Sequence, residues 1–311
     1  MTRKKTVFTL IVLVALLSLS TAAVAPAFNV GGFRDVTAPG AVETDTYGIN
    51  ASGVITGDYV DSAGAQHGMI LRGKKLTTVD NKSCVTTPGS GATDGIQFYG
   101  INSTGVIAGW CGTTSGTTIG FTYAKGNFKN ISISGSSEVE ANGINDARDI
   151  VGTYFDSAGT QHGFLLVGRK LTKLDPPGVD SLATAWSIND AGVITIFGLD
   201  STGLHYLSFT TANKGKTYKA FHAKGEGKSG GKTTSGTAIH TINNNGDLVA
   251  TYFDSAGNRH GVLLHSGKQY SFDDPNGSGS TRADGLSDTL GIVGRYGSGK
   301  YGGTGFFAQA K

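Results

Sequence analysis

The chain has 311 residues, with 26 Lys and Arg against 23 Asp and Glu, 49 glycines and two cysteines. Three basic residues near the N-terminus account for the formal charge of +3, so the remainder is formally neutral and lacks the basic excess of a general nucleic-acid-binding protein. Glycine at this abundance, without a collagen period, indicates many tight turns, and two cysteines are too few for a disulfide-built fold.

Residues 1–27 have the layout of a secretory signal peptide. Basic residues 3–5 precede an apolar run over 7–19, and Ala25 and Ala27 form an A-x-A pattern. We place cleavage after Ala27. The apolar run is shorter than the roughly 20 residues that span a bilayer core. We therefore expect no transmembrane anchor after signal removal, and a secreted, periplasmic or cell-surface location.

The mature chain, residues 28–311, contains six copies of one repeat. Each copy has an apolar anchor before a turn, and the anchors are Ile49, Ile101, Ile144, Ile188, Ile242 and Leu286. Their spacings of 52, 43, 44, 54 and 44 residues correspond to a period near 44 with two insertions. Arg148 and Leu290 replace the turn glycine in two copies, so we expect those two turns to differ from the others.

Each repeat divides into four short segments rich in β-branched and aromatic residues. In the third copy they end at Ile144 and then cover 150–155, 163–167 and 171–174, with turn residues between them. Four consecutive antiparallel strands in every repeat of this length are typical of a β-propeller blade. The sequence therefore predicts an all-β, six-bladed β-propeller as a single domain.

The two ends of the chain supply complementary parts of one repeat. The sixth copy stops after its third strand, and residues 33–40 resemble residues 171–178, which follow the third strand of the third copy. We expect 33–36 to lie beside 306–309 and close the ring. The predicted blades cover about 41–90, 91–138, 139–180, 181–234, 235–278, and 279–311 together with 29–40.

The repeats resemble bacterial extracellular repeat proteins of the HAF type, named for a His-Ala-Phe motif on the third strand. The resemblance covers 31–311 and is carried by the Ile-Asn turns, the Y-x-D-S-A-G hairpins and the His-Gly pairs at His67, His162 and His260. Gly replaces the Ala of the motif in all three pairs, and the even copies depart further, at 118–120, 205–206 and 304–305. The resemblance implies export and a repeat architecture, and it implies no reaction.

Three similar hairpins in alternate copies carry an aspartate and a histidine. These face residues are Asp61, Asp156 and Asp254 with His67, His162 and His260. They could ring a ligand or metal site on one face of the propeller. Alternatively, each Asp caps its own turn and bonds the nearby His. We favour the second hypothesis, because these turns lie away from the propeller axis, and we assign no catalytic, cofactor-binding or metal residue.

The two cysteines are expected to pair. Cys84 lies in the insertion after the fourth strand of the first copy, and Cys111 ends the second strand of the next copy. Both positions fall on the same face at neighbouring blades. Export would place them in an oxidising compartment, where disulfides persist.

The insertion of the fourth copy is rich in lysine. It could hold an acidic polysaccharide, although such loops are usually only solvated. Segments near Gly227 and Gly230 imitate half of a phosphate-binding loop, but His222 and Glu226 replace its first glycine, so we exclude nucleotide binding. The candidate basic residues are Lys224, Lys228 and Lys232.

The sequence shows no G-x-S-x-G nucleophile elbow in a strand-to-helix context and no H-E-x-x-H helix, the motifs of common hydrolases. We therefore predict a monomeric, cofactor-free and non-catalytic propeller that binds an extracellular or envelope carbohydrate or protein, and no nucleic acid. Two alternatives stay open. One is a carbohydrate-active hydrolase or lyase that uses single-copy residues such as Asp180, His222 or Asp284, and the other is an envelope structural protein. In each case we expect the function to depend on residues at positions where the copies differ.

Overall fold

The computed structural model describes residues 28–85, 95–228, 234–297 and 303–311. The predicted signal peptide over 1–27 and Lys232 lie outside the described residues. Within those residues the chain forms 24 β-strands and no helix, which confirms the all-β prediction. The described part accordingly contains no helix with the length and apolarity needed to cross a bilayer.

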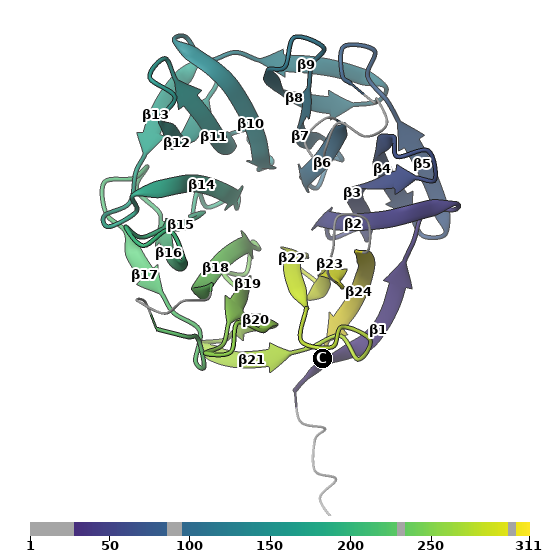
Figure 1. Cartoon of the computed structure of the whole chain (residues 1–311), viewed down its shortest axis with the longest axis vertical. Coiled ribbons are helices and arrows are strands. Elements are labelled where there is room, and N and C mark those ends of the chain that lie inside the picture. The colour runs from purple at the N-terminus through teal and green to yellow at the C-terminus, as the bar shows by residue number, and fades with distance from the viewer. Residues whose placement is uncertain (1–27, 86–94, 229–233, 298–302) are drawn as a thin grey trace, which may run out of the picture.

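The strands form six four-stranded antiparallel units around a central axis (Figure 1). Unit one comprises β2 (Ala41–Ile49), β3 (Val54–Asp61), β4 (Gln66–Arg72) and β5 (Lys75–Val79). Unit two comprises β6 (Ile96–Ile101), β7 (Ile107–Gly112), β8 (Thr118–Ala124) and β9 (Asn127–Ile131). Unit three comprises β10 (Ser136–Ile144), β11 (Ile150–Asp156), β12 (Gln161–Val167) and β13 (Lys170–Leu174).

The second half of the ring repeats this order. Unit four comprises β14 (Ser181–Ile188), β15 (Ile194–Leu199), β16 (His205–Thr211) and β17 (Lys219–Phe221). Unit five comprises β18 (Ser235–Ile242), β19 (Leu248–Phe253), β20 (Arg259–His265) and β21 (Lys268–Phe272). Unit six comprises β22 (Arg282–Leu286), β23 (Gly291–Tyr296), β24 (Thr304–Ala310) and the N-terminal strand β1 (Val30–Val36). A short parallel pairing of β16 with β18 joins units four and five into one eight-stranded sheet.

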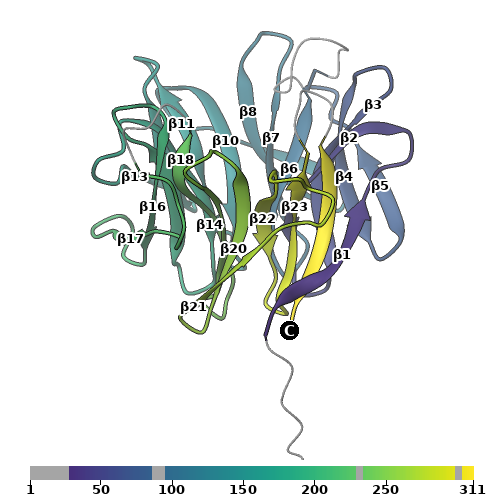
Figure 2. The same cartoon turned by 60° about the horizontal axis from the view of Figure 1, so that its bottom comes forward.

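The two ends of the chain pair as the sequence predicts. β1 runs antiparallel to β24, with Asp35 opposite Phe306 and Val36 opposite Gly305. The Phe33 ring packs between Phe272 and Phe306, at centroid distances of 6.2 and 5.6 Å. The N-terminal strand therefore completes unit six and covers the edge that β24 would otherwise expose (Figure 2).

The first strand of each unit lies nearest the axis (Figure 1). Apolar side chains pack between neighbouring units. Phe98 of unit two packs in one cluster with Ile70 of unit one, and Phe164 of unit three packs with Ala108 of unit two. Both phenylalanines are fully buried. The core thus holds successive units together side by side and leaves the inner strands facing the axis.

The turns between the first and second strands share one geometry, including the two that we expected to differ. Arg148 and Leu290 have φ values of 66° and 63°, close to the 72° of Gly53 in unit one. Their amides donate to Asn145 and Ser287 as the Gly53 amide donates to Asn50. That expectation was wrong, because these two side chains tolerate the left-handed conformation at a cost of roughly 1–2 kcal/mol each.

Candidate functional site

The inner strands bring six side chains of five residue types together at the axis. They occupy the position two residues before each repeat anchor, and all six are buried: Tyr47, Tyr99, Asn142, Trp186, His240 and Asp284. We call this set the central layer. The copies carry Gly, Ser or Thr at the next position and Ile or Leu at the anchor, whereas this position holds Tyr, Asn, Trp, His or Asp, so the central layer is a varied part of an otherwise repeated scaffold.

Aromatic rings fill much of the central layer. Tyr47 stacks on Tyr99 with ring centroids 4.3 Å apart, and Trp186 meets Tyr99 edge-on at 5.3 Å. His240 lies 4.7 Å from Trp186, and its Nδ1 lies 2.6 Å from the Ala283 carbonyl oxygen. Burial lowers the pKa of His240 to about 4, so the ring is neutral at neutral pH and donates from Nδ1.

Charged side chains lie next to the central layer. Arg282 donates through Nε to Asp284 at 2.7 Å, and its guanidinium lies 5.4 Å from the Trp186 ring centroid. Arg295 of β23 bonds Asp45 of β2 across the junction of units six and one, and its Nη1 lies 3.6 Å from Glu43 Oε1. We call Glu43, Asp45, Asp58, Arg282 and Arg295 the charged layer. It joins the first and last units of the ring.

The central and charged layers line a channel along the axis, and the charged layer lies toward one end of it. Three carboxylate oxygens of these two layers are buried and unpartnered among the described residues. They are Asp45 Oδ1, Asp58 Oδ1 and Asp284 Oδ2. Burial raises the pKa of Asp58 well above its usual range, while its Oδ2 accepts a bond of 2.7 Å from the Gln66 side-chain amide. Buried acceptors of this kind require a proton, a water or a ligand donor. The described residues contain no group of three or more His, Cys, Asp or Glu that could hold a metal ion.

Two glutamates in the channel have pKa values near neutrality. Burial and the Asp45 charge raise the pKa of Glu43 to about 7, and burial and the Glu138 charge raise that of Glu140 to about 7. Because the folded-state pKa exceeds the usual 4.5, the stability that these groups contribute is present below pH 4.5 and is lost as pH rises through 7.

We expect Glu43→Gln and Glu140→Gln each to reduce the fall in melting temperature between pH 5 and pH 8 by a few degrees. The substituted amide has no proton to lose, so it avoids placing a buried charge at pH 8. Thermal unfolding of wild type and variants across this range checks the prediction. At pH 5, where the side chains are neutral in both folded proteins, the variants should differ from the wild type much less than at pH 8. An unchanged pH dependence would contradict the assignment.

A cavity of about 100 Å3 lies at the other end of the channel, where the turns after the inner strands meet. Repeated asparagines form a belt around it, because each side-chain amide donates to the carbonyl of the equivalent residue in the next unit. These bonds measure 3.0–3.3 Å and run through Asn50, Asn102, Asn145, Asn189, Asn243 and finally Ser287. The Ile-Asn turns that identify the repeat thus also link neighbouring units.

The three Asp-His hairpins are separate structures on units one, three and five. In unit three, Asp156 Oδ1 accepts the amides of Ala158 and Thr160, both at 2.9 Å, and Oδ2 lies 3.2 Å from His162 Nε2. The other ring nitrogen lies 3.2 Å from both oxygens of Asp175. Asp61 with His67 and Asp254 with His260 repeat this arrangement. Turn capping and histidine clamping therefore account for these residues.

Each hairpin has a second carboxylate, and we did not predict from the sequence that this carboxylate holds the histidine. His67 and His260 contact Asp80 and Asp273 at 2.9 and 3.0 Å, as His162 contacts Asp175. Each of these aspartates follows its histidine by 13 residues. This constant spacing across three copies is the signal that identifies the pair.

We expect His162→Ala to lower the free energy of unfolding by about 1–3 kcal/mol, because two carboxylates lose their partner in a mostly buried position. The His162 side chain is 8% exposed, whereas that of His260 is 20% exposed, so His260→Ala should cost less. Urea unfolding of both variants checks the order. Loss of ligand binding with unchanged stability would instead favour a ligand site at the hairpin.

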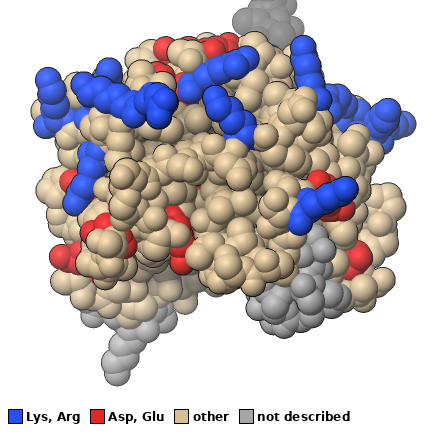
Figure 3. Space-filling model, turned by 90° about the horizontal axis from the view of Figure 1, so that it is seen from above, with Lys and Arg blue, Asp and Glu red and all other residues tan. Residues whose placement is uncertain are grey.

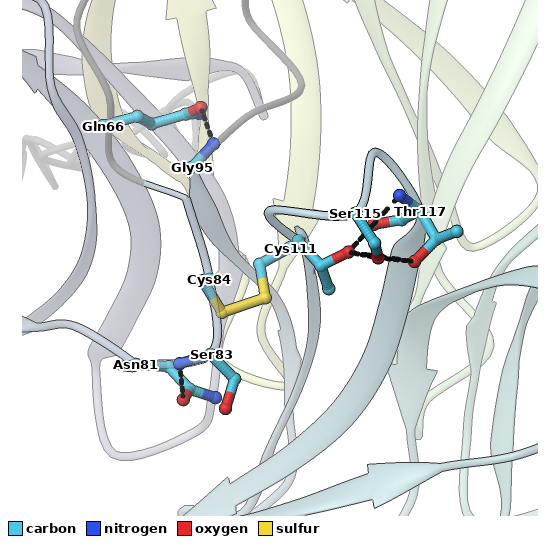
Figure 4. Close-up of a disulfide and its surroundings, with 9 residues drawn as sticks. Gln66, Asn81, Ser83, Cys84, Gly95, Cys111, Ser115 and Thr117 are labelled. Carbon is cyan, nitrogen blue, oxygen red and sulfur yellow. Dashed lines mark hydrogen bonds between the residues drawn. A yellow bond between two sulfur atoms is a disulfide. The ribbon is translucent and has the colours of Figure 1, made fainter.

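Cys84 and Cys111 form a disulfide in the structure, with Cα atoms 5.7 Å apart (Figure 4). It ties the segment after β5 of unit one to β7 of unit two. An amide bond from Val85 to the Gly112 carbonyl, at 2.9 Å, reinforces the same junction.

The remaining candidates lie outside the channel, with one exception. Lys224 and Lys228 are exposed on the connection between β17 and β18. Asp180 is also exposed, and His222 pairs with Glu226 at 2.8 Å on the same connection. Of the single-copy residues proposed for an enzyme, the structure places only Asp284 in the central layer.

Comparison with known proteins gives a fold and no family. No family model and no curated protein matches the chain. Among solved structures it is similar to putative TolB from Agrobacterium tumefaciens, with a TM-score of 0.52, 11% identity, and coverage of 73% of this chain and 79% of that one. It is also similar to Aleuria aurantia lectin in complex with alpha-methyl-L-fucoside, with a TM-score of 0.50, 12% identity, and coverage of 83% and 88%.

A third similar structure is Hadza microbial sialidase Hz136, with a TM-score of 0.51 and 13% identity. The match covers 86% of this chain but 65% of the sialidase, so the chain spans about two thirds of that protein. Identities at this level concern the fold alone, and together with the ring of four-stranded sheets they show that the chain is a β-propeller.

Proposed function

We propose that this chain is an exported six-bladed β-propeller that binds a carbohydrate, without transforming it, at the end of the channel that carries the charged layer. The observation that carries the proposal is the set of three buried carboxylate oxygens without a donor, on Asp45, Asp58 and Asp284. Sugar hydroxyl groups donate to such acceptors and accept from neighbouring guanidinium groups. The same end of the channel therefore offers both halves of a hydroxyl-binding site.

An aromatic surface lies beside these groups. Tyr206 and Phe253 stack with ring centroids 5.6 Å apart and an interplanar angle of 7°, and both are partly exposed. Arg259 lies close enough to Arg282 and Arg295 that, in addition to burial, their charges lower the pKa of its guanidinium. A flat aromatic face next to charged donors and acceptors suits the apolar face and the hydroxyl edge of a sugar ring.

The similar structures support this choice of ligand class. The Aleuria aurantia structure holds a fucoside, and the Hadza microbial protein is named as a sialidase. Both are propeller-like chains whose descriptions refer to a carbohydrate or to an enzyme that acts on one. Their identity to this chain is too low to assign equivalent binding residues. The export implied by the HAF-type repeats would place the site outside the cytoplasm, where such ligands occur.

Hydrolysis of the bound carbohydrate is the second candidate function. Glu43 and Glu140, with pKa values of about 7, can hold or release a proton near neutral pH. Glu43 lies beside Asp45 and Arg295, so one carboxyl can stay protonated next to a second one that is paired with a cation. This division of roles is what acid-base hydrolysis requires.

A glycan array combined with a polysaccharide degradation screen tests both functions. For a glycan that binds, Asp45→Asn and Arg259→Gln should each weaken binding by about tenfold or more, the loss expected for one charge-assisted hydrogen bond. Asp180→Asn, an exposed aspartate outside the channel, is the matched control and should bind as the wild type does. Binding that survives unchanged in both channel variants contradicts the site, and released sugar products would establish the hydrolase.

A further inference from the structure

The hairpins between the third and fourth strands carry only basic charges. Five of these hairpins, in units one to five, expose Lys or Arg and contain no Asp or Glu. We call these residues the basic rim: Arg72, Lys74, Lys75, Lys125, Arg169, Lys170, Lys214, Lys216 and Lys268. All of them are exposed.

The basic rim lies at one end of the molecule. Strands alternate in direction within each unit, so these hairpins lie at the same end as the turns between first and second strands. In the side view of Figure 3, Lys and Arg follow one edge of the ring, and most of the acidic surface in view lies away from that edge. The rim therefore spans most of the circumference of one face.

The opposite end carries the acidic hairpins. Asp61, Asp156 and Asp254 lie there, each with its second aspartate at the end of the fourth strand. Residues 28–311 contain equal numbers of basic and acidic residues. The neutral chain is thus divided into a face with a basic circumference and a face with acidic hairpins.

Three acidic side chains on the rim's own face, Asp146, Asp190 and Asp288, lie at the channel mouth, and Asp247 pairs with His265 next to the unit-five hairpin at 2.9 Å. Asp190 accepts the Asp146 amide, and Asp288 accepts the Asn244 amide, both at 2.8 Å. These carboxylates are engaged by neighbouring turns near the axis, while the rim lysines and arginines lie at the circumference. A flat partner resting on this face meets the cations of the rim first.

We propose that the basic rim docks the protein onto a planar anionic surface, the headgroup plane of a bilayer containing acidic phospholipids. Cations distributed around five of six units can all meet a plane, whereas a linear polyanion follows one line and reaches only part of the rim. Each Lys or Arg near such a surface contributes about 1 kcal/mol at low ionic strength. Leu171 is the one large apolar side chain within the described third-to-fourth-strand hairpins that is exposed, so the attraction is electrostatic.

Docking in this orientation fixes where the rest of the molecule points. The rim and the charged layer lie toward opposite ends of the channel. Asp45 and Arg282 of the charged layer lie before the C-terminal ends of the inner strands β2 and β22, whereas the rim hairpins lie at the same end as the turns that follow the inner strands. The carbohydrate site proposed above would then face away from the membrane. The two proposals rest on different residues and fail independently.

Sedimentation with phospholipid vesicles tests the docking surface. The full mature chain should pellet with phosphatidylcholine vesicles that contain about one third phosphatidylglycerol, and not with pure phosphatidylcholine. High salt should release it, because exposed charges are screened within about 10 Å at 0.1 M salt. The triple variant Lys75→Glu, Arg169→Glu, Lys170→Glu should lose binding by about tenfold or more.

The control variant makes the same change in net charge at the other end. Lys82→Glu, Lys224→Glu and Lys228→Glu alter exposed lysines on the connections between units, and should leave vesicle binding close to that of wild type. Thermal unfolding establishes that both triple variants are folded. Equal loss in both variants, wild-type binding by the rim variant, or equal binding to neutral vesicles would overturn the proposal. Tighter binding to a linear polyanion such as heparin would also overturn it.

Discussion

Replacing Val36 with Asp should lower the free energy of unfolding by about 3–5 kcal/mol, the effect of leaving a charge buried without a partner. Val36 is the last residue of β1 and is 4% exposed. It packs in one cluster with Ile55 and Met69 of unit one and with Val293 of unit six. The substitution therefore acts on both sides of the junction between unit six, which holds the two chain ends, and unit one.

Thr37→Asp supplies the matched control, because the next residue is exposed and outside the strand. It should unfold at the same urea concentration as wild type, while Val36→Asp unfolds earlier. Loosening of β1 also frees the edge of β24, so Val36→Asp should associate at high concentration in light scattering. If both variants unfold alike, β1 does not close the ring in solution.

The double variant Cys84→Ser, Cys111→Ser should lose about 3–4 kcal/mol of stability. The disulfide closes a loop with a sequence separation of 27, and loop-closure entropy of that length gives this magnitude. Unlike a core substitution, the change acts mainly on the unfolded chain, which gains freedom when the link is removed. Urea unfolding of the variant and of wild type with reductant should give the same midpoint.

Two outcomes would contradict this prediction. A wild type insensitive to reductant and equal in stability to the double variant would show that the thiols do not pair in solution. A single variant, Cys84→Ser, that is markedly less stable than the double variant would show that packing of the remaining free thiol dominates. Thiol counting under denaturing conditions distinguishes paired from free cysteines directly.

The repeated part of the molecule could be predicted from the sequence. The pairing of 33–36 with 306–309 follows from a repeat whose missing strand appears at the other end of the chain, and the structure confirms it. Turn capping by Asp61, Asp156 and Asp254 follows from short-range chemistry of the same kind. Arg148 and Leu290 were misjudged, because the hydrogen bonds of the turn outweigh the preference for glycine.

The channel could not be assembled from the sequence. Its residues can be recognised in the sequence only as positions at which the copies differ. Such differences do not reveal which residues contact one another. Arg295 and Asp45 are 250 residues apart, and their contact depends on closure of the ring. Asp284 was named as a single-copy candidate, but its pairing with Arg282 and the stacking of Tyr47 on Tyr99 require the three-dimensional arrangement.

The side-chain hydrogen bonds of the asparagine belt all run from one unit to the next and stop at unit six. The six junctions between units are therefore not equivalent. Within the described residues, five junctions carry the amide bond, and Ser287 of unit six turns instead to its own hairpin. At the sixth junction, Arg295 bonds Asp45, and the Thr46 hydroxyl donates to the Gly294 carbonyl at 2.6 Å. An ion pair therefore supports the one junction in the described part of the chain that lacks the belt bond, the junction between unit six, where the two chain ends meet, and unit one. Any molecule that bridges Asp45 and Asp284 also spans this junction, so occupancy of the site and mechanical strength of the ring rise together.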